Sequence, residues 1–249
     1  MSRDRLFHRG VHLYLEKECK MIAVQWLGTV EYLQALERQH ILAAERAEDR
    51  NLTDVLLLLE HPPTYTMGKR GKMEHLLLRQ DVLARMGFAF HTVDRGGDIT
   101  YHGPGQLVGY PILNLKQRYC PGTGRGIDLH RYVHDVEEML ILTLTDSGIR
   151  GQRCQGYPGV WVESDSGLAK IAAIGIRVNR RGISSHGFAL NVDPDLSHFQ
   201  HIIPCGISSH GVTSIAALSG HSVDVQDILP RLCRAFSQTF QAELVLQNF

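Results

Sequence analysis

The chain lacks the features that mark membrane-spanning, disulfide-bonded and nucleic-acid-binding proteins. Its longest strongly apolar run, residues 55–59, is far too short to span a bilayer. Its five cysteines are irregularly spaced and odd in number, so we predict no disulfide framework and a cytoplasmic protein. Basic and acidic residues balance at 26 each, which leaves no net charge to hold a nucleic acid or an anionic membrane.

Several common catalytic signatures are also missing. The most glycine-rich segment lacks the Gly-Lys-Ser/Thr ending of a phosphate-binding loop and the spacing of a dinucleotide fingerprint. Cys205, His186, His201 and His210 are suitable metal ligands by type, but no Cys-x-x-Cys or His-Glu-x-x-His spacing accompanies them. We therefore expect neither a metal site nor a bound cofactor.

Residues 1–20 differ from the rest of the chain. They carry mixed charges around a short apolar patch without a small-residue cleavage site, so a secretory signal is not indicated. A clear strand pattern begins at Met21, and no linker rich in proline or serine follows it. We predict that residues 1–20 are a leader, either an upstream start or a docking helix, and that residues 21–249 form one catalytic domain.

Apolar residues at spacings of three and four predict three long helices. The first follows Thr29, the second covers residues 129–144, and the third covers residues 228–240 with Pro230 in its first turns or at a kink. The inner face of the first helix is predicted to consist of Leu33, Leu36, His40, Ala43 and Ala47.

Extended patterns separate these helices. They cover residues 22–26, 55–59, 64–67, 106–113, 159–162, 170–178 and 182–192. Strands and helices in this order do not alternate strictly, which favours an α+β fold. We predict a mixed, largely antiparallel sheet flanked by helices.

Residues 95–106 are the densest mixture of glycine, proline and polar side chains. Glycine lets the backbone approach a ligand closely, and polar side chains orient the ligand. The segment is a candidate binding loop; the alternative is a tight double turn with capping side chains.

Cys205 lies between Pro204 and Gly206, in a turn that suits a thiol at the mouth of a pocket. A thiol of pKa ~8.5 is mostly protonated at neutral pH, so a nucleophile needs a neighbouring base or cation. The alternative is an inert turn cysteine. Cys233, on the last helix, is expected to be a small buried hydrophobe.

Lys170 opens a strand of small and apolar residues. Desolvation there would lower its pKa from ~10.4 toward catalytic values, whereas a lysine at a strand entry commonly keeps its amine in water.

A short basic group consists of Lys69, Arg70, Lys72 and Arg79. It is either a solvated surface or a rim that receives an acidic partner.

Six motifs, taken in order, resemble those of the bacterial lipoyl(octanoyl) transferases. They are residues 60–68 (EHPPTYTMG), 95–111 (RGGDITYHGPGQLVGYP), 159–162 (GVWV), 170–175 (KIAAIG), 186–191 (HGFALN), and 204–207 (PCGI) with 211–214 (GVTS). The match runs from about Met21 to the final helix.

The resemblance implies a fold similar to the catalytic domain of lipoate and biotin protein ligases. It also implies transfer of an octanoyl group from octanoyl-acyl carrier protein to a lysine of lipoyl domains, the first step of endogenous protein lipoylation. The implied acceptors are the E2 subunits of 2-oxoacid dehydrogenases and the glycine-cleavage H protein.

The family uses a cysteine and a lysine, which match Cys205 as the nucleophile that carries the acyl thioester and Lys170 as general base or as the cation that lowers the thiol pKa. The position of Asp98 varies in the family, so the resemblance gives that residue no specific role. The residues that match the family's acyl-substrate contacts are Arg95, Gly96, Gly97, Asp98, Ile99, Thr100, Tyr101, His102, Ala173, Ile174, Gly175, Gly187, Phe188 and Ala189.

Two alternative functions share this fold. An ATP-dependent lipoate-protein ligase activates a free acid as an acyl-adenylate and needs no cysteine nucleophile. A non-catalytic module that binds acyl carrier protein or lipoyl domains would tolerate the loss of Cys205. The presence of Cys205 and Lys170 within their motifs favours the transferase.

Overall fold

The computed structural model describes residues 20–49, 51–120, 126–164, 167–203 and 211–247. In these residues one large sheet has the strand order β12-β1-β2-β6-β10-β9-β8-β7, with β11 paired to β9, and a small sheet has the order β4-β3-β5. The strands of the large sheet are β1 (Lys20–Thr29), β2 (Asp54–Glu60), β6 (Gln106–Ile112), β7 (Gln152–Cys154), β8 (Tyr157–Ser164), β9 (Gly167–Val178), β10 (Ser184–Asn191), β11 (Gly211–Val212) and β12 (Ala242–Gln247). Those of the small sheet are β3 (Thr64–Met67), β4 (Ala89–Thr92) and β5 (Ile99–His102).

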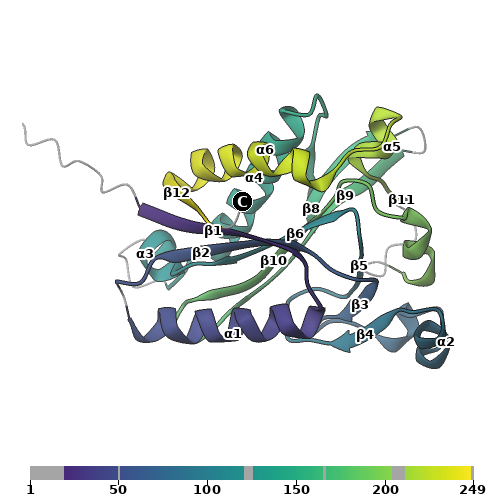
Figure 1. The fold of residues 1–249 in the computed structure, drawn as a ribbon, viewed down its shortest axis with the longest axis horizontal. Coiled ribbons are helices and arrows are strands. Elements are labelled where there is room, and N and C mark those ends of the chain that lie inside the picture. Colours follow the sequence, from purple (N-terminus) through teal and green to yellow (C-terminus); the bar gives the residue numbers. More distant parts are fainter. Residues whose placement is uncertain (1–19, 50, 121–125, 165–166, 204–210, 248–249) are drawn as a thin grey trace, which may run out of the picture.

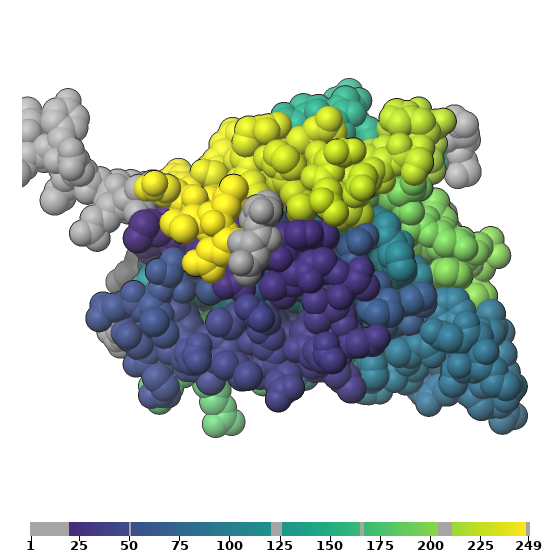
Figure 2. Space-filling model, viewed as in Figure 1, coloured from purple at the N-terminus to yellow at the C-terminus, as the bar shows by residue number. Residues whose placement is uncertain are grey.

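Helices cover both faces of the large sheet (Figure 1). The α-helices are α1 (Tyr32–Glu48), α2 (Gln80–Arg85), α3 (Leu115–Tyr119), α4 (Leu129–Thr145), α5 (Ile215–Ser219) and α6 (Val225–Phe240), and the short 3-10 helices are η1 (Met73–His75) and η2 (Leu196–His201). Helices α4 and α6 lie over one face and α1 lies over the other. The space-filling view shows β1, in purple, between α1 below it and β12 and α6, in yellow, above it (Figure 2).

Antiparallel pairs join β2, β6, β10, β9, β8 and β7, and parallel pairs join β12 to β1, β1 to β2 and β11 to β9. The predicted α+β fold with a mixed, largely antiparallel sheet is therefore confirmed. The predicted helix at residues 129–144 is α4, and Pro230 lies inside α6 beyond its first turn.

The apolar run at residues 55–59 is explained by the position of β2 inside the large sheet. Leu56 and Leu58 belong to the cluster under α4 and α6, whereas Leu57 and Leu59 belong to the cluster under α1. A strand that is buried on both faces has no solvent-facing positions, so its sequence shows no polar alternation.

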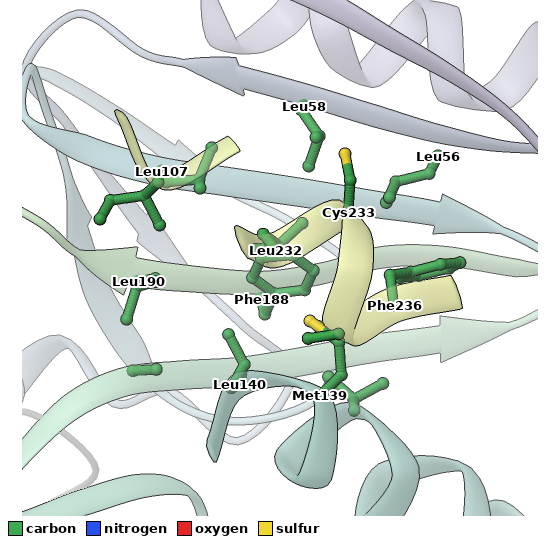
Figure 3. Close-up of a cluster of buried hydrophobic side chains, with 14 of the residues drawn as sticks. Leu56, Leu58, Leu107, Met139, Leu140, Phe188, Leu190, Leu232, Cys233 and Phe236 are labelled. Atoms are coloured by element: carbon green, nitrogen blue, oxygen red, sulfur yellow. The ribbon is translucent and has the colours of Figure 1, made fainter. Parts of the chain in front are cut away.

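The main core lies between the large sheet and helices α4 and α6 (Figure 3). Met139 and Leu140 of α4 and Leu232 and Phe236 of α6 pack toward the sheet, close to Phe188 of β10. Cys233 is 9% exposed and belongs to the same cluster, as predicted for a cysteine on a helix face.

The predicted inner face of α1 is only partly right: Ala43 is buried, but two of the five predicted residues are exposed. Its buried residues are Tyr32, Ala35, Gln39, Ala43 and Arg46, whereas Leu33 is 55% exposed and His40 is also exposed. Spacing of apolar residues failed here because two buried residues are polar and have partners. Gln39 Oε1 accepts a hydrogen bond from the His186 backbone N–H (2.7 Å), and Arg46 Nε donates to Asp54 Oδ1 (2.8 Å).

The first described strand begins one residue before the predicted domain start. Lys20 is the first residue of β1 and pairs with Ala242 of β12. Residues 1–19, which make up almost all of the predicted leader, lie outside the described residues. Among the helices that are described, none is both long enough and apolar enough to cross a membrane.

The buried face of α6 and the exposed face of α1 lead to a stability prediction. Leu232→Ala removes a side chain that is 0% exposed, so we expect a loss of about 2–5 kcal/mol in the free energy of unfolding. Leu33→Ala is the control: it removes the same atoms from an exposed position of α1, and we expect a change below about 0.5 kcal/mol. Urea denaturation of both variants measures the difference, and equal losses would contradict this assignment of helix faces.

Candidate active site

A cavity of about 500 Å³ lies between the 95–100 segment and strands β9 and β10. All of the predicted substrate-contact residues line it except Tyr101, and Lys170 lines it as well. Residues separated by up to 94 positions in the sequence, such as Arg95 and Ala189, are thus brought to one site. Cys205 lies outside the described residues.

Tyr101 is the exception because its ring is directed into the small-sheet cluster. Its neighbours Thr100 and His102 in β5 line the cavity, and its own ring packs against Tyr65 in the small-sheet cluster. Its hydroxyl lies 2.7 Å from His198 Nδ1. Tyr101 therefore packs β5 against the small-sheet cluster.

Small residues form the part of the large sheet that faces the 95–97 loop. Gly175 of β9 pairs with Gly187 of β10, and Ala173 pairs with Ala189. A Cβ on Gly175 would lie 3.0 Å from the Gly96 carbonyl oxygen, so the close approach of the loop depends on this glycine. A Cβ on Gly187 would lie 2.2 Å from the Gly109 carbonyl oxygen, so this glycine permits the close approach of β10 to β6.

Apolar side chains line another part of the cavity. Phe188 is 2% exposed and belongs to the main core, and Ile174 and Ile176 are partly buried and pack against that core. Because the core holds these side chains in place, the apolar lining is already formed without a ligand. Such a lining suits a hydrocarbon chain.

Arg95 is buried, at 7% exposure, and its guanidinium is used to hold the loop to strand β3. Nη2 donates to the Thr66 carbonyl (2.6 Å) and to Thr66 Oγ1 (2.9 Å), and Nη1 donates to the Gly96 carbonyl (3.0 Å). A charged donor with several acceptors makes strong hydrogen bonds, so the loop has a fixed conformation.

Lys170 lies on β9 with its side chain against β8. Its Nζ is 3.4 Å from the Pro158 carbonyl oxygen and 4.7 Å from the centroid of the Trp161 ring. An aromatic face attracts a cation, so this position suits the protonated amine. Lys170 is partly buried. Its surroundings are therefore intermediate between the desolvated lysine and the water-exposed lysine that the sequence left open.

The segment that carries Cys205 is flanked by described residues at the edge of the same cavity. Before it, the Ile203 N–H donates to the carbonyl of His75 (2.8 Å), and His75 lines the cavity. After it, Val212 of β11 pairs with Lys170 and also lines the cavity. Asp98 also contacts His75, because its Oδ2 lies 2.5 Å from His75 Nδ1.

A chain of hydrogen bonds runs from His102 to the strand that carries Lys170. Gln106 Nε2 donates to Asn191 Oδ1 (2.9 Å), so its Oε1 is the acceptor for His102 Nδ1 at 2.8 Å. Asn191 Nδ2 donates to the Thr213 carbonyl (3.0 Å), and the Thr213 N–H donates to the Lys170 carbonyl (3.0 Å). Burial lowers the pKa of His102 well below its usual range, so its ring is neutral and protonated at Nδ1.

Sequence reasoning missed a group of rings beside His102. The Tyr32 ring stacks on His102 at 5.9 Å between centroids, and His61 lies edge-on to His102 at 5.6 Å. His61 donates from Nδ1 to the Val30 carbonyl and accepts at Nε2 from the Tyr110 hydroxyl, both at 2.7 Å. His61 and Tyr110 lie inside the recognised motifs, which was an available signal, whereas nothing in the sequence singled out Tyr32.

Most of the chain matches one family model. Residues 31–237 match the lipoyl protein ligase A/B catalytic domain. Octanoyltransferases from Solibacter usitatus and Chloroflexus aggregans are 47% and 44% identical to the chain; they align with 88% and 89% of it and with 93% and 96% of their own lengths.

Solved structures show the same fold. A bipartite lipoate protein ligase from Thermoplasma acidophilum superposes with a TM-score of 0.68 at 16% identity, covering 92% of this chain and 88% of its own. A lipoate-protein ligase A bound with ATP gives a TM-score of 0.66 at 15% identity, covering 93% and 89%.

The chain belongs to the lipoyl protein ligase A/B catalytic domain family. Within that family the relatives that it matches over most of their length are named octanoyltransferases. The recognition from sequence motifs and the predicted enzyme class, an acyltransferase, are thereby confirmed.

The buried histidines lead to a prediction about pH. Burial lowers the pKa of His61 to about 4, although its bond to Val30 partly opposes this. As the pH falls from about 6.5 toward 4, the unfolded chain therefore takes up a proton that the folded protein does not. Stability is lost over that range, on the order of 2 kcal/mol at pH 5 from His61 alone.

The measurement is urea denaturation at pH 7 and pH 5. We expect His61→Gln to lose less stability on acidification than the wild-type protein does. His221→Gln, at an exposed position away from the cavity, is the control and should keep the wild-type pH dependence. An unchanged pH dependence in His61→Gln would refute the neutral state of His61.

Proposed function

We propose that this enzyme transfers an octanoyl group from octanoyl-acyl carrier protein to a specific lysine of lipoyl domains in the cytoplasm, the first step of endogenous protein lipoylation. The observation that carries the proposal is the cavity itself. It is lined by Lys170 and by every predicted substrate-contact residue except Tyr101, in a chain whose relatives are octanoyltransferases.

The octanoyl chain would lie along the apolar lining formed by Ile174, Phe188 and Ala189. Burial of hydrocarbon stabilises a complex by about 0.8 kcal/mol per methylene before the entropy of binding is subtracted. The thioester carbonyl would then lie toward Lys170.

In the first half-reaction, the Cys205 thiolate attacks the thioester carbonyl of the donor. A new sulfur–carbon bond forms, the bond to the carrier's sulfur breaks, and the carrier leaves as a thiol after taking a proton from Lys170, which becomes neutral. One thioester is exchanged for another, so the step needs no ATP. A protonated Lys170 stabilises the thiolate, and its place over the Trp161 ring supports that charge state.

In the second half-reaction, the amine of the acceptor lysine attacks the acyl thioester on Cys205. An amide bond forms, the thiolate leaves, and the amine loses a proton to a base. Lys170 in its neutral form takes this proton. Cys205 and Lys170 thus exchange one proton during the cycle, because a neutral and a charged lysine cannot act at once.

The proposed partners are octanoyl-acyl carrier protein as donor and, as acceptors, the lipoyl domains of 2-oxoacid dehydrogenase E2 subunits and the glycine-cleavage H protein. Lys69, Arg70 and Lys72 are exposed, and Arg70 also lines the cavity. A cationic rim at this place supports the docking of an acidic partner.

An ATP-dependent lipoate-protein ligase is the second candidate, because solved ligases share the fold. It would form an acyl-adenylate from free octanoate, with pyrophosphate as product. A non-catalytic binding module is the third candidate and would show no turnover at all.

Intact-mass spectrometry distinguishes the three candidates. The enzyme is mixed with octanoyl-acyl carrier protein without ATP and without acceptor. We expect one octanoyl adduct on Cys205 that disappears when a lipoyl domain is added. Transfer from free octanoate that requires ATP would instead support the ligase, and absence of any transfer would support the binding module.

Two substitutions test the catalytic assignments. We expect Cys205→Ser to abolish the adduct and Lys170→Ala to slow transfer by at least about 100-fold, the scale of a lost acid–base group, with the fold intact. Cys120→Ser and Lys116→Ala, both at exposed positions, are matched controls that should keep full activity. Near-normal turnover in either test variant removes that residue from the mechanism.

A further inference from the structure

His186 is a buried cavity residue to which neither the motifs nor the mechanism gives a role. It is 1% exposed and lines the cavity where β10 begins. Its backbone has φ of 54°, which is uncommon for a residue other than glycine and is found most often where surrounding contacts enforce it.

The side chain of His186 is held by Asp94, at the start of the 95–97 loop. His186 Nε2 donates to Asp94 Oδ1 at 3.0 Å. His186 Nδ1 is buried without a hydrogen-bond partner among the described residues. The bond to Asp94 is therefore the hydrogen bond that holds the ring in its position among the described residues.

Asp94 has a second partner on β9. Arg177 Nη1 lies 2.9 Å from Asp94 Oδ2, so the carboxylate bridges β9 and β10. Although partial burial alone would raise the pKa of Asp94, the hydrogen bond from His186 and the charge of Arg177 lower it. The carboxylate is therefore ionised at neutral pH, and its negative charge is stabilised from both strands.

This bridge lies next to the contact between the loop and the sheet. His186 pairs with Ile176, and the Ile176 carbonyl accepts a hydrogen bond from the Gly96 N–H at 3.0 Å. Asp94 therefore connects the loop to β9 and β10 at the same level as Gly96. Ile176 lies six residues along β9 from Lys170, or about 20 Å at the rise of a strand.

Helix α1 also contacts this point, in addition to the loop, β9 and β10. The backbone N–H of His186 donates to Gln39 Oε1 of α1 at 2.7 Å. His186 thus connects α1, β10 and the loop, at the end of the cavity opposite to Lys170. A change at this point would move the loop without touching the reacting atoms.

We propose that Asp94 and His186 are a positioning pair that clasps the 95–97 loop onto strands β9 and β10 and thereby sets the acyl-chain length that the cavity accepts. The proposal rests on the proposed function, because it assigns chain-length selection to the cavity of that function. When the clasp is loosened, the far end of the cavity widens, and chains longer than octanoyl are discriminated less.

Asp94→Asn and His186→Asn test the pair. Asp94→Asn keeps the size of the side chain and removes its charge. His186→Asn removes the imidazole with a residue that tolerates positive φ, so the backbone conformation is retained. Asp146→Asn is the matched control, because it breaks the exposed Arg234–Asp146 ion pair (3.2 Å) outside the cavity.

The activity readout is transfer from acyl-carrier proteins loaded with six-, eight-, ten- and twelve-carbon chains. For each test variant we expect the preference for eight over twelve carbons, in kcat/KM, to fall about 10-fold, mainly through KM. The double variant should resemble the single variants, because the two residues act as one unit. A chain-length profile equal to that of Asp146→Asn would overturn the proposal.

A second readout does not depend on activity. Hydrogen exchange at the Gly96 amide, whose bond to the Ile176 carbonyl reports the closed loop, should be at least about 10-fold faster in Asp94→Asn than in Asp146→Asn. If the wild-type enzyme transfers no octanoyl group and this exchange still changes, the clasp stands and the proposed function fails. If transfer is observed and exchange is unchanged, the clasp fails and the function stands.

Discussion

The buried guanidinium of Arg95 is the interaction on which the rest of the site depends. It fastens the 95–97 loop to Thr66 in the small sheet, and the neighbouring Gly96 N–H fastens the same loop to Ile176 in the large sheet. The cavity exists between these two attachments. A buried charge must keep its hydrogen-bond acceptors, so Arg95 keeps the loop attached to the small sheet.

Electrostatics inside the cavity follow from burial. His61, His102 and His186 all have a pKa that burial lowers, so the rings at this end are neutral. The buried guanidinium of Arg95 is stabilised by its hydrogen bonds to the Thr66 carbonyl and the Thr66 hydroxyl. These neutral rings lie at the end of the cavity where the apolar side chains of Ile174, Ile176 and Phe188 also line it.

The three long helices and most strands of the large sheet could be predicted, because the spacing of their apolar residues is regular over many positions. Short elements such as β4, β7 and α2 were not predicted. The prediction was only partly right for the face of α1. Gln39 and Arg46 are buried there only because His186 and Asp54, distant in the sequence, satisfy their polar groups. Such pairing between distant residues leaves no mark in the spacing of one helix. Tyr101 shows the complementary case: its motif predicted a substrate contact, but its ring packs against Tyr65 in the small-sheet cluster instead of lining the cavity.

The sequence by itself determined the family, the class of enzyme and most of the residues around the cavity, because six motifs in order specify glycine turns, small strand residues and a lysine together. Tertiary structure decided which of those residues face one another. Register between β9 and β10 places Gly175 opposite Gly187 and makes room for the 95–97 loop. The same register places Arg177 of β9 next to His186 of β10, and the Asp94 carboxylate of the loop contacts both side chains, since pairing in the folded chain joins residues across any distance in the sequence.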